Sequence, residues 1–168
     1  MFIRINENKA FHSNNNGNII LIFIEGTILM HKNILNIYNF KNYIPIKNSV
    51  EKIKNWNEQG FEIKYLSSRR TENEIMYIKN ILEKNNFCGN ELYFRNKTEE
   101  YYNIAEEIMP KIIIEDNCKS IGGIKQTTIY KIDETKKIQI KSILVNEFKG
   151  IDHLPNNTME LLNYRNYE

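Results

Sequence analysis

The sequence has few of the residues that point to a secreted or membrane protein. It contains only two cysteines among 168 residues, Cys88 and Cys118, with no Cys-x-x-Cys pair and no histidine at metal-ligand spacing. Neither a disulfide framework nor a zinc site is therefore predicted. No apolar run reaches the roughly 20 residues of a membrane helix, and no basic-then-apolar leader opens the chain. These absences favour a reducing, cytoplasmic setting away from membranes.

The charge balance is close to neutral. The chain carries 23 lysines and arginines against 21 aspartates and glutamates, which gives a formal net charge of +2. A surplus of this size does not predict binding to nucleic acid or to an anionic membrane. Glycine is paired only at Gly122-Gly123, which is too sparse for a dinucleotide-binding fingerprint. With 41% apolar residues, the whole chain, 1–168, is expected to form one domain.

The strongest local signal lies at residues 19–29. Six consecutive apolar residues, Ile19 to Ile24, are too few for a membrane helix and suit a strand buried on both faces. Glu25-Gly26-Thr27 follows at once, a carboxylate next to the residue that tolerates any backbone conformation. In open α/β sheets, ligands bind beyond the carboxyl ends of the strands. This turn is therefore the predicted position of a functional site.

Further strands and helices alternate along the chain. Hydrophobic periodicity and turn residues predict strands over 61–66, 91–94, 111–117 and 127–132, and helices over 49–59, 71–84, 95–109 and 157–164. Residues 134–148 suit either a helix or a strand, and residues 1–18 are expected to form an N-terminal extension or edge hairpin. The alternation predicts a parallel, Rossmann-like sheet in a three-layer α/β/α sandwich.

The connector over 28–48 contains Tyr38, Phe40 and Tyr43. About thirty residues separate the Gly26 turn from the next predicted strand, and a helix takes about a dozen of them, so the connector has room for a flap but not for a cap domain. We expect its aromatic residues to pack on the edge of the sheet rather than to stack on a ligand. His31, just past the turn, could lie over the site, but a position at the surface is the favoured expectation.

Residues 19–29 resemble the first motif of the haloacid dehalogenase (HAD) superfamily of phosphohydrolases. That motif is a hydrophobic strand followed by Asp-x-Asp-Gly-Thr and then Ile or Leu. Gly26, Thr27 and Ile28 fix the register. Phe23 then occupies the position of the family's nucleophilic aspartate, and Glu25 occupies that of its acid/base aspartate. The chain is most similar to small HAD-like proteins without a cap, with a degenerate first motif.

Three further segments match the family's remaining motifs in order and spacing. Ser67 ends the second strand, where the family's hydroxyl binds a phosphoryl oxygen. Lys97, with Arg95 as second choice, matches the cation that steadies the phosphate. Glu115 and Asp116 match the acidic pair that helps to hold Mg²⁺. Taken alone, these two carboxylates are also compatible with a strand end followed by a helix cap.

The resemblance thus implies a phosphate pocket beside a weakened Mg²⁺ site. The implied phosphate ligands are the amides of Gly26 and Thr27 together with Ser67 and Lys97. The implied metal ligands are the backbone carbonyl of Glu25 together with Glu115 and Asp116.

The substitutions in the first motif predict impaired catalysis. Phe23 has no lone pair, so no phosphoenzyme can form at that position, and loss of a covalent nucleophile costs on the order of 10⁶ in turnover. The extra methylene of Glu25 moves its carboxylate by about 1.5 Å, a misplacement that costs on the order of 10²-fold. The main hypothesis is therefore a HAD-like domain that binds phosphate or serves a regulatory role.

Two alternatives stay open. The first is an active cap-less phosphatase that uses Glu25 or Asp116 on a phosphorylated metabolite, nucleotide or macromolecule. The second is a nucleic-acid-associated accessory module that uses Arg69, Arg70 and the lysine-rich segments, although the near-neutral charge argues against it. The expected partner is a small phosphorylated ligand or a macromolecular phosphate. Oligomeric state and substrate identity have no signal in the sequence.

Overall fold

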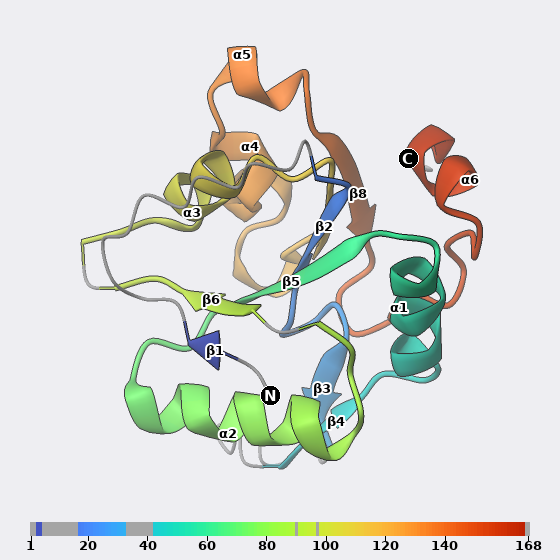
Figure 1. The fold of residues 1–168 in the computed structure, drawn as a ribbon. Coiled ribbons are helices and arrows are strands. Elements are labelled where there is room, and N and C mark those ends of the chain that lie inside the picture. The colour runs from blue at the N-terminus through green and yellow to red at the C-terminus, as the bar shows by residue number, and fades with distance from the viewer. Residues whose placement is uncertain (1–2, 5–16, 33–41, 90, 97, 167–168) are drawn as a thin grey trace.

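The computed structural model describes residues 3–4, 17–32, 42–89, 91–96 and 98–166. Its centre is a six-stranded sheet in the order β1-β6-β5-β2-β7-β8, in which all neighbouring strands run parallel (Figure 1). The strands are β1 (Ile3–Arg4), β2 (Ile19–Phe23), β5 (Glu62–Ser67), β6 (Glu91–Phe94), β7 (Ile112–Asp116) and β8 (Lys141–Val145). The strand with the strongest sequence signal, β2, is thus central.

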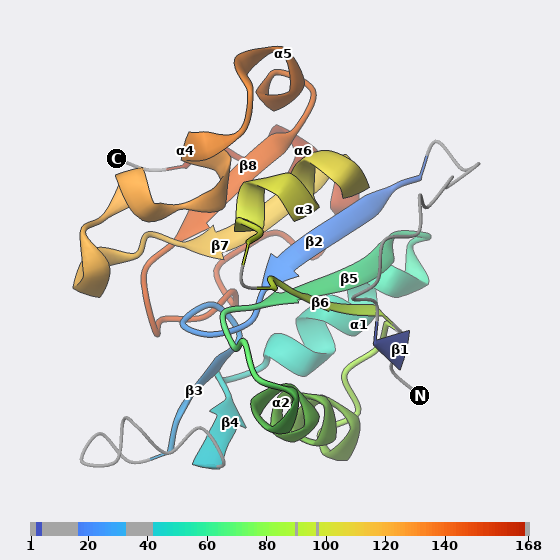
Figure 2. The same cartoon turned by 90° about the vertical axis from the view of Figure 1, so that its left-hand side faces the viewer.

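Helices cover both faces of the sheet. One layer holds α1 (Ser49–Glu58), α2 (Glu72–Lys84) and α6 (Thr158–Asn163), and the other holds α3 (Tyr101–Ile108), α4 (Thr128–Lys131) and α5 (Glu134–Lys137). Figure 2 shows α1 and α2 on the opposite side of the sheet from α3, α4 and α5. The predicted three-layer α/β/α sandwich is confirmed. Within the described ranges, none of the helices combines the length and apolar character needed to cross a membrane.

The alternation of side chains along β2 explains why this strand is a continuous apolar run. Ile20 and Ile22 belong to the core that includes α1 and α2, whereas Leu21 belongs to the core that includes α3 and α4. All three are fully buried. A strand between two helical layers buries both of its faces, so polar residues are tolerated only where the strand ends.

The connector after β2 forms a small antiparallel pair, β3 (Leu29–His31) and β4 (Tyr43–Pro45). We refer to this pair as the flap. Tyr43 is 7% exposed and belongs to the core that includes α1 and α2, as expected for an aromatic residue packed at the sheet. Tyr38 and Phe40 lie outside the described residues.

Two element predictions need correction. Residues 127–132 were expected to form a strand, but they contain helix α4, and the sheet position beside β7 is taken by β8. The first turn of α4 is favoured because the Glu115 carboxylate accepts the N–H groups of Thr128 and Ile129. The helix expected from residue 95 begins only at Tyr101, where the N–H of Glu100 donates to Oδ1 of Asn103 at 2.9 Å.

The two ambiguous segments are resolved only in part. Residues 134–148 contain α5 and then strand β8. Of the N-terminal segment, β1 is the short edge strand and pairs in parallel with β6. Residues 5–16 lie outside the described residues, so an edge hairpin there stays a prediction.

Candidate functional site

Phe23 is the last residue of β2 and lies in the wall of a pocket at the carboxyl end of the sheet. Because alternate residues of a strand point to opposite faces, Phe23 shares the face of Leu21, toward α3. Its ring meets the ring of Tyr101 edge to face, with the centroids 5.1 Å apart. The ring stays partly exposed. The expected nucleophile position therefore presents an aromatic ring to the pocket.

The turn after β2 brings Gly26 against Asp116. Gly26 has a φ of +81°, and a Cβ at this position would lie 2.7 Å from Oδ2 of Asp116. The N–H of Gly26 donates to the carbonyl of Leu29 at 3.0 Å, and its carbonyl accepts from the N–H of Phe148 at 2.7 Å. The amide of Gly26, a predicted phosphate ligand, is thus already hydrogen-bonded within the turn.

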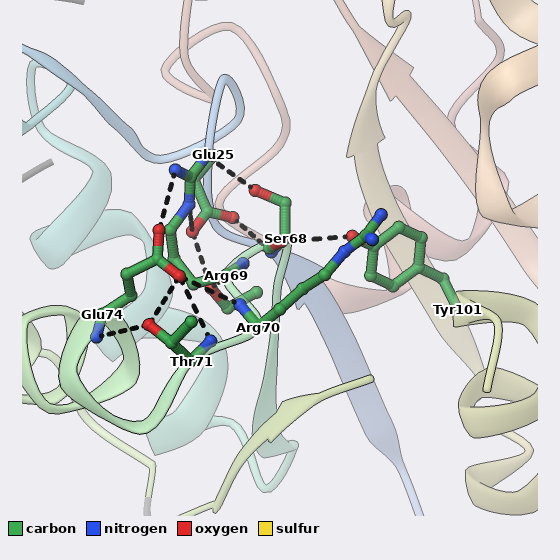
Figure 3. Close-up of polar contacts among 8 residues, drawn as sticks. Glu25, Ser68, Arg69, Arg70, Thr71, Glu74 and Tyr101 are labelled. Carbon is green, nitrogen blue, oxygen red and sulfur yellow. Dashed lines mark hydrogen bonds and ion pairs between the residues drawn. The ribbon is translucent and has the colours of Figure 1, made fainter. Parts of the chain in front are cut away.

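The carboxylate of Glu25 joins the end of β2 to the end of β5. Its Oε1 accepts the hydroxyl of Ser67 at 2.6 Å, and its Oε2 accepts the backbone N–H of Ser68 at 2.8 Å (Figure 3). Oε1 also lies 3.7 Å from Nε of Arg69. The Ser67 hydroxyl, which was predicted to bind a phosphoryl oxygen, therefore donates a hydrogen bond to Glu25 in this structure.

Arg69 extends this network to the start of α2. Its Nη1 lies 3.7 Å from Oε1 of Glu74, and its Nη2 donates to Oγ of Ser68 at 3.1 Å. Glu74 in turn forms the predicted capping box with Thr71, in which each residue accepts the other's backbone N–H. Figure 3 shows these contacts running from Glu25 through Arg69 to Glu74. The first turn of α2 thus helps to fix the guanidinium at the pocket.

Arg95 and Tyr101 form the wall on the side of α3. The Cζ atom of Arg95 lies 4.5 Å from the ring centre of Tyr101, and its Nη1 is 2.6 Å from Oε2 of Glu100. The hydroxyl of Tyr101 donates to the carbonyl of Ser68 at 3.3 Å. Burial raises the pKa of Tyr101, so its phenol is neutral. This wall combines an aromatic ring with a cation stacked on it.

Glu115, near the end of β7, is turned away from the solvent. It is 2% exposed, and its two oxygens accept the backbone N–H groups of Thr128 at 2.7 Å and Ile129 at 2.9 Å. Burial raises the pKa of Glu115 to about 7, and these hydrogen bonds act in the opposite direction. The side chain therefore caps α4.

Asp116 ends β7 and faces the Gly26 turn. It is 6% exposed, and its Oδ1 accepts the N–H of Cys118 at 2.8 Å. Burial raises its pKa, and the nearby charge of Glu147 adds to the effect. Of the two predicted acidic ligands, Asp116 is the one whose carboxylate lies between the ends of β2 and β7.

These groups surround a pocket of about 480 Å³. Five predicted site residues line it: Phe23, Glu25, Gly26, Glu115 and Asp116. Thr27 and Ser67 are fully buried behind its wall. Lys97 lies outside the described residues, whereas Arg95, the second choice for that role, lines the pocket.

The flap also contributes to the pocket, an arrangement that the sequence analysis considered but did not favour. His31 of β3 and Tyr43 of β4 line it, and their ring centroids are 4.4 Å apart. Burial lowers the pKa of His31, and the charge of Arg69 acts in the same direction, so the imidazole is neutral at pH 7. His31 is partly exposed and lines the pocket, which matches the less favoured expectation that it lies over the site. Its place just past the Gly26 turn was the available signal.

Charged residues of both signs line the pocket. Three arginines follow β5 and β6, namely Arg69, Arg70 and Arg95, and two of them are paired with Glu25 and Glu100. Asp116 ends β7 and Glu147 follows β8, whereas the Glu115 carboxylate is directed to α4. Because all three arginines follow β5 and β6, that side of the pocket is the one suited to an anion.

No protein-family model and no curated protein matches the sequence. Solved structures do match. A chain of the Pnkp1/Rnl/Hen1 complex gives a TM-score of 0.54 at 12% identity and covers 85% of this chain. A chain of the Pnkp1/Rnl/Hen1 RNA repair complex gives 0.55 at 12% identity over 84%. This chain spans about half of those two chains, 52% and 47%.

The third similar structure is the class C acid phosphatase from Bacillus anthracis with tungstate bound. It gives a TM-score of 0.54 at 15% identity and covers 82% of this chain and 70% of that chain. These likenesses agree with the predicted α/β fold with a parallel, Rossmann-like sheet. At such identities they establish the fold alone.

Proposed function

We propose that this chain is a phosphate-binding protein with a HAD-like fold and an impaired phosphohydrolase site. The observation that carries the proposal is the position of Phe23. Its ring lines the pocket at the tip of β2, next to the turn that places Gly26 against Asp116. An aromatic ring has no lone pair with which to attack phosphorus, so the covalent route is closed at this residue.

Glu25 is assigned a structural role in this proposal. Both of its oxygens accept hydrogen bonds from the end of β5, and one also pairs with Arg69. A general acid must lie within hydrogen-bond reach of the leaving group, whereas this carboxylate is turned toward Ser67 and Ser68. The same side chain that lines the pocket therefore holds two strand ends together.

The arginines supply the proposed anion site. Arg69, Arg70 and Arg95 all line the pocket, and the planar guanidinium fork matches the oxygens of a phosphate better than an ammonium does. Arg69 and Arg95 are partly neutralised by Glu25 and Glu100. We therefore expect modest affinity for free phosphate. The predicted contribution of Lys97 stays a prediction.

Mg²⁺ is implied by the fold family, and the donor groups fit it poorly. Mg²⁺ demands near-octahedral oxygen ligands, but both oxygens of Glu115 accept N–H groups of α4. Asp116 and the backbone carbonyl of Glu25 are left from the predicted set. Within the described ranges, no group of three or more His, Cys, Asp or Glu side chains could hold a metal ion. The proposed anion binding accordingly rests on the arginines.

Two measurements test the proposal. Turnover of p-nitrophenyl phosphate with Mg²⁺ should be absent in the wild type and detectable in the F23D/E25D double variant. Inorganic phosphate, titrated calorimetrically, should bind the wild type and bind about fivefold or more weakly to Arg70→Ala, since a charge-assisted hydrogen bond contributes upward of ~1 kcal/mol. Arg165→Ala, which removes an exposed arginine outside the pocket, is the matched control.

The active-phosphatase alternative makes the opposite prediction. Wild-type turnover that is abolished by Asp116→Asn would establish it and overturn the impaired-enzyme proposal. The nucleic-acid alternative predicts oligonucleotide binding that weakens steeply with salt. It gains no independent support from the RNA repair structures, because the likeness to them is one of fold over part of their length.

A further inference from the structure

Aromatic pairs reach the pocket from both layers of the fold. Phe23 and Tyr101, edge to face at 5.1 Å, pack with the core that includes α3 and α4. His31 and Tyr43, whose tilted rings have centroids 4.4 Å apart, come from the flap, and Tyr43 belongs to the core that includes α1 and α2. All four rings line the same pocket. Inorganic phosphate alone gives no physical reason for so much aromatic surface at its binding site.

Three arginines line the same pocket as these two aromatic pairs. Arg69 and Arg70 follow β5, and Arg95 follows β6 and stacks on Tyr101 at 4.5 Å. Figure 3 shows the side chain of Arg70 extending in the direction of Tyr101. The pocket therefore offers guanidinium groups for an anion beside rings for a planar apolar group. Its volume of about 480 Å³ is within the range of small-ligand sites.

We propose that the ligand of this pocket is a nucleoside phosphate, whose base contacts the aromatic rings and whose phosphate lies on the arginine side. This inference rests on the phosphate site proposed above and names the class of compound that the site takes. Phe23 then serves in binding, because the ring that stands at the nucleophile position becomes part of the surface on which the base lies. Every base has a π-face, so such stacking tolerates different bases.

Calorimetric titration of AMP and of ribose 5-phosphate, which lacks the base, tests this inference. Base–aromatic stacking of ~1–3 kcal/mol predicts that AMP binds about 5- to 150-fold more tightly than ribose 5-phosphate. Phe23→Leu should remove most of that advantage and leave ribose 5-phosphate binding unchanged. Phe23→Tyr, which retains the ring, should keep the advantage.

A second variant protects the test against misfolding of Phe23→Leu. Tyr101→Leu should also reduce the preference for AMP, whereas Tyr130→Leu should not, because Tyr130 is 51% exposed and lies outside the pocket. Equal affinities of the wild type for AMP and ribose 5-phosphate would overturn the inference and leave the phosphate site standing. Failure of every phosphate compound to bind would overturn the proposed function as well.

Discussion

Replacing Glu25 by alanine should destabilise the fold markedly, although the residue lines an open pocket. The substitution leaves two donors without their acceptor, the hydroxyl of Ser67 and the N–H of Ser68. A hydrogen bond to a charged group contributes ~1.5–3 kcal/mol, and we take the lower end because water can enter the pocket. The partly exposed pair with Arg69 adds less than about 1 kcal/mol. The expected loss in free energy of unfolding is therefore about 3 kcal/mol.

Urea unfolding followed by the fluorescence of Trp56, the single and fully buried tryptophan, measures this loss. Glu25→Gln keeps one acceptor oxygen and should lose about half as much. Glu51→Ala, which removes an exposed carboxylate on α1, should stay within about 0.5 kcal/mol of the wild type. If Glu25→Ala also stayed within that margin, the carboxylate would not hold the strand ends together, and the structural role assigned to it would be wrong.

Three further substitutions probe the frame of the pocket by the same unfolding measurement. Gly26→Ala should cost at least about 2 kcal/mol, because φ is +81° and the added Cβ would meet Asp116 at 2.7 Å. Glu115→Ala should cost about 3 kcal/mol by leaving two buried N–H groups without an acceptor, and Glu115→Gln should cost less; a loss of amide protection confined to α4 would identify the cap. Thr71→Ala should cost about 1 kcal/mol by removing the acceptor for the N–H of Glu74, and no loss would show that this cap is dispensable.

The sequence predicts the sheet well wherever a strand is buried on both faces. The apolar runs of β2 and β7 are too short for a buried helix and suit a buried strand, and both strands lie in the interior of the sheet. Residues 127–132 mislead because five of them, Thr127 to Tyr130 and Ile132, suit a strand by composition. Their conformation is decided by Glu115, which is distant in sequence and caps α4 with its carboxylate. Strand and helix propensities describe neighbouring residues only and do not include such a tertiary contact.

For the candidate site, too, the positions of residues at strand ends follow from the sequence, whereas the directions of their side chains do not. Phe23, Glu25, Gly26 and Asp116 line one pocket because strand ends in a parallel sheet converge at one edge. The direction of each carboxylate could not be predicted. Whether Glu115 faces the pocket or α4 depends on a helix start that the sequence did not reveal. The ring contact between His31 and Tyr43 depends on the pairing of β3 with β4, two strands separated by residues 32–42.

The two substitutions in the first motif are best understood together. An aspartate in place of Phe23 would forfeit the contact with Tyr101, which is worth ~0.5–1.5 kcal/mol beyond burial. An aspartate in place of Glu25 would be too short to keep its bonds to both Ser67 and Ser68 at 2.6 and 2.8 Å. Each reversal thus removes a contact that now stabilises the tip of β2. The F23D/E25D variant should therefore unfold at lower urea concentration than the wild type, and its turnover is informative only at temperatures where fluorescence of Trp56 shows it folded.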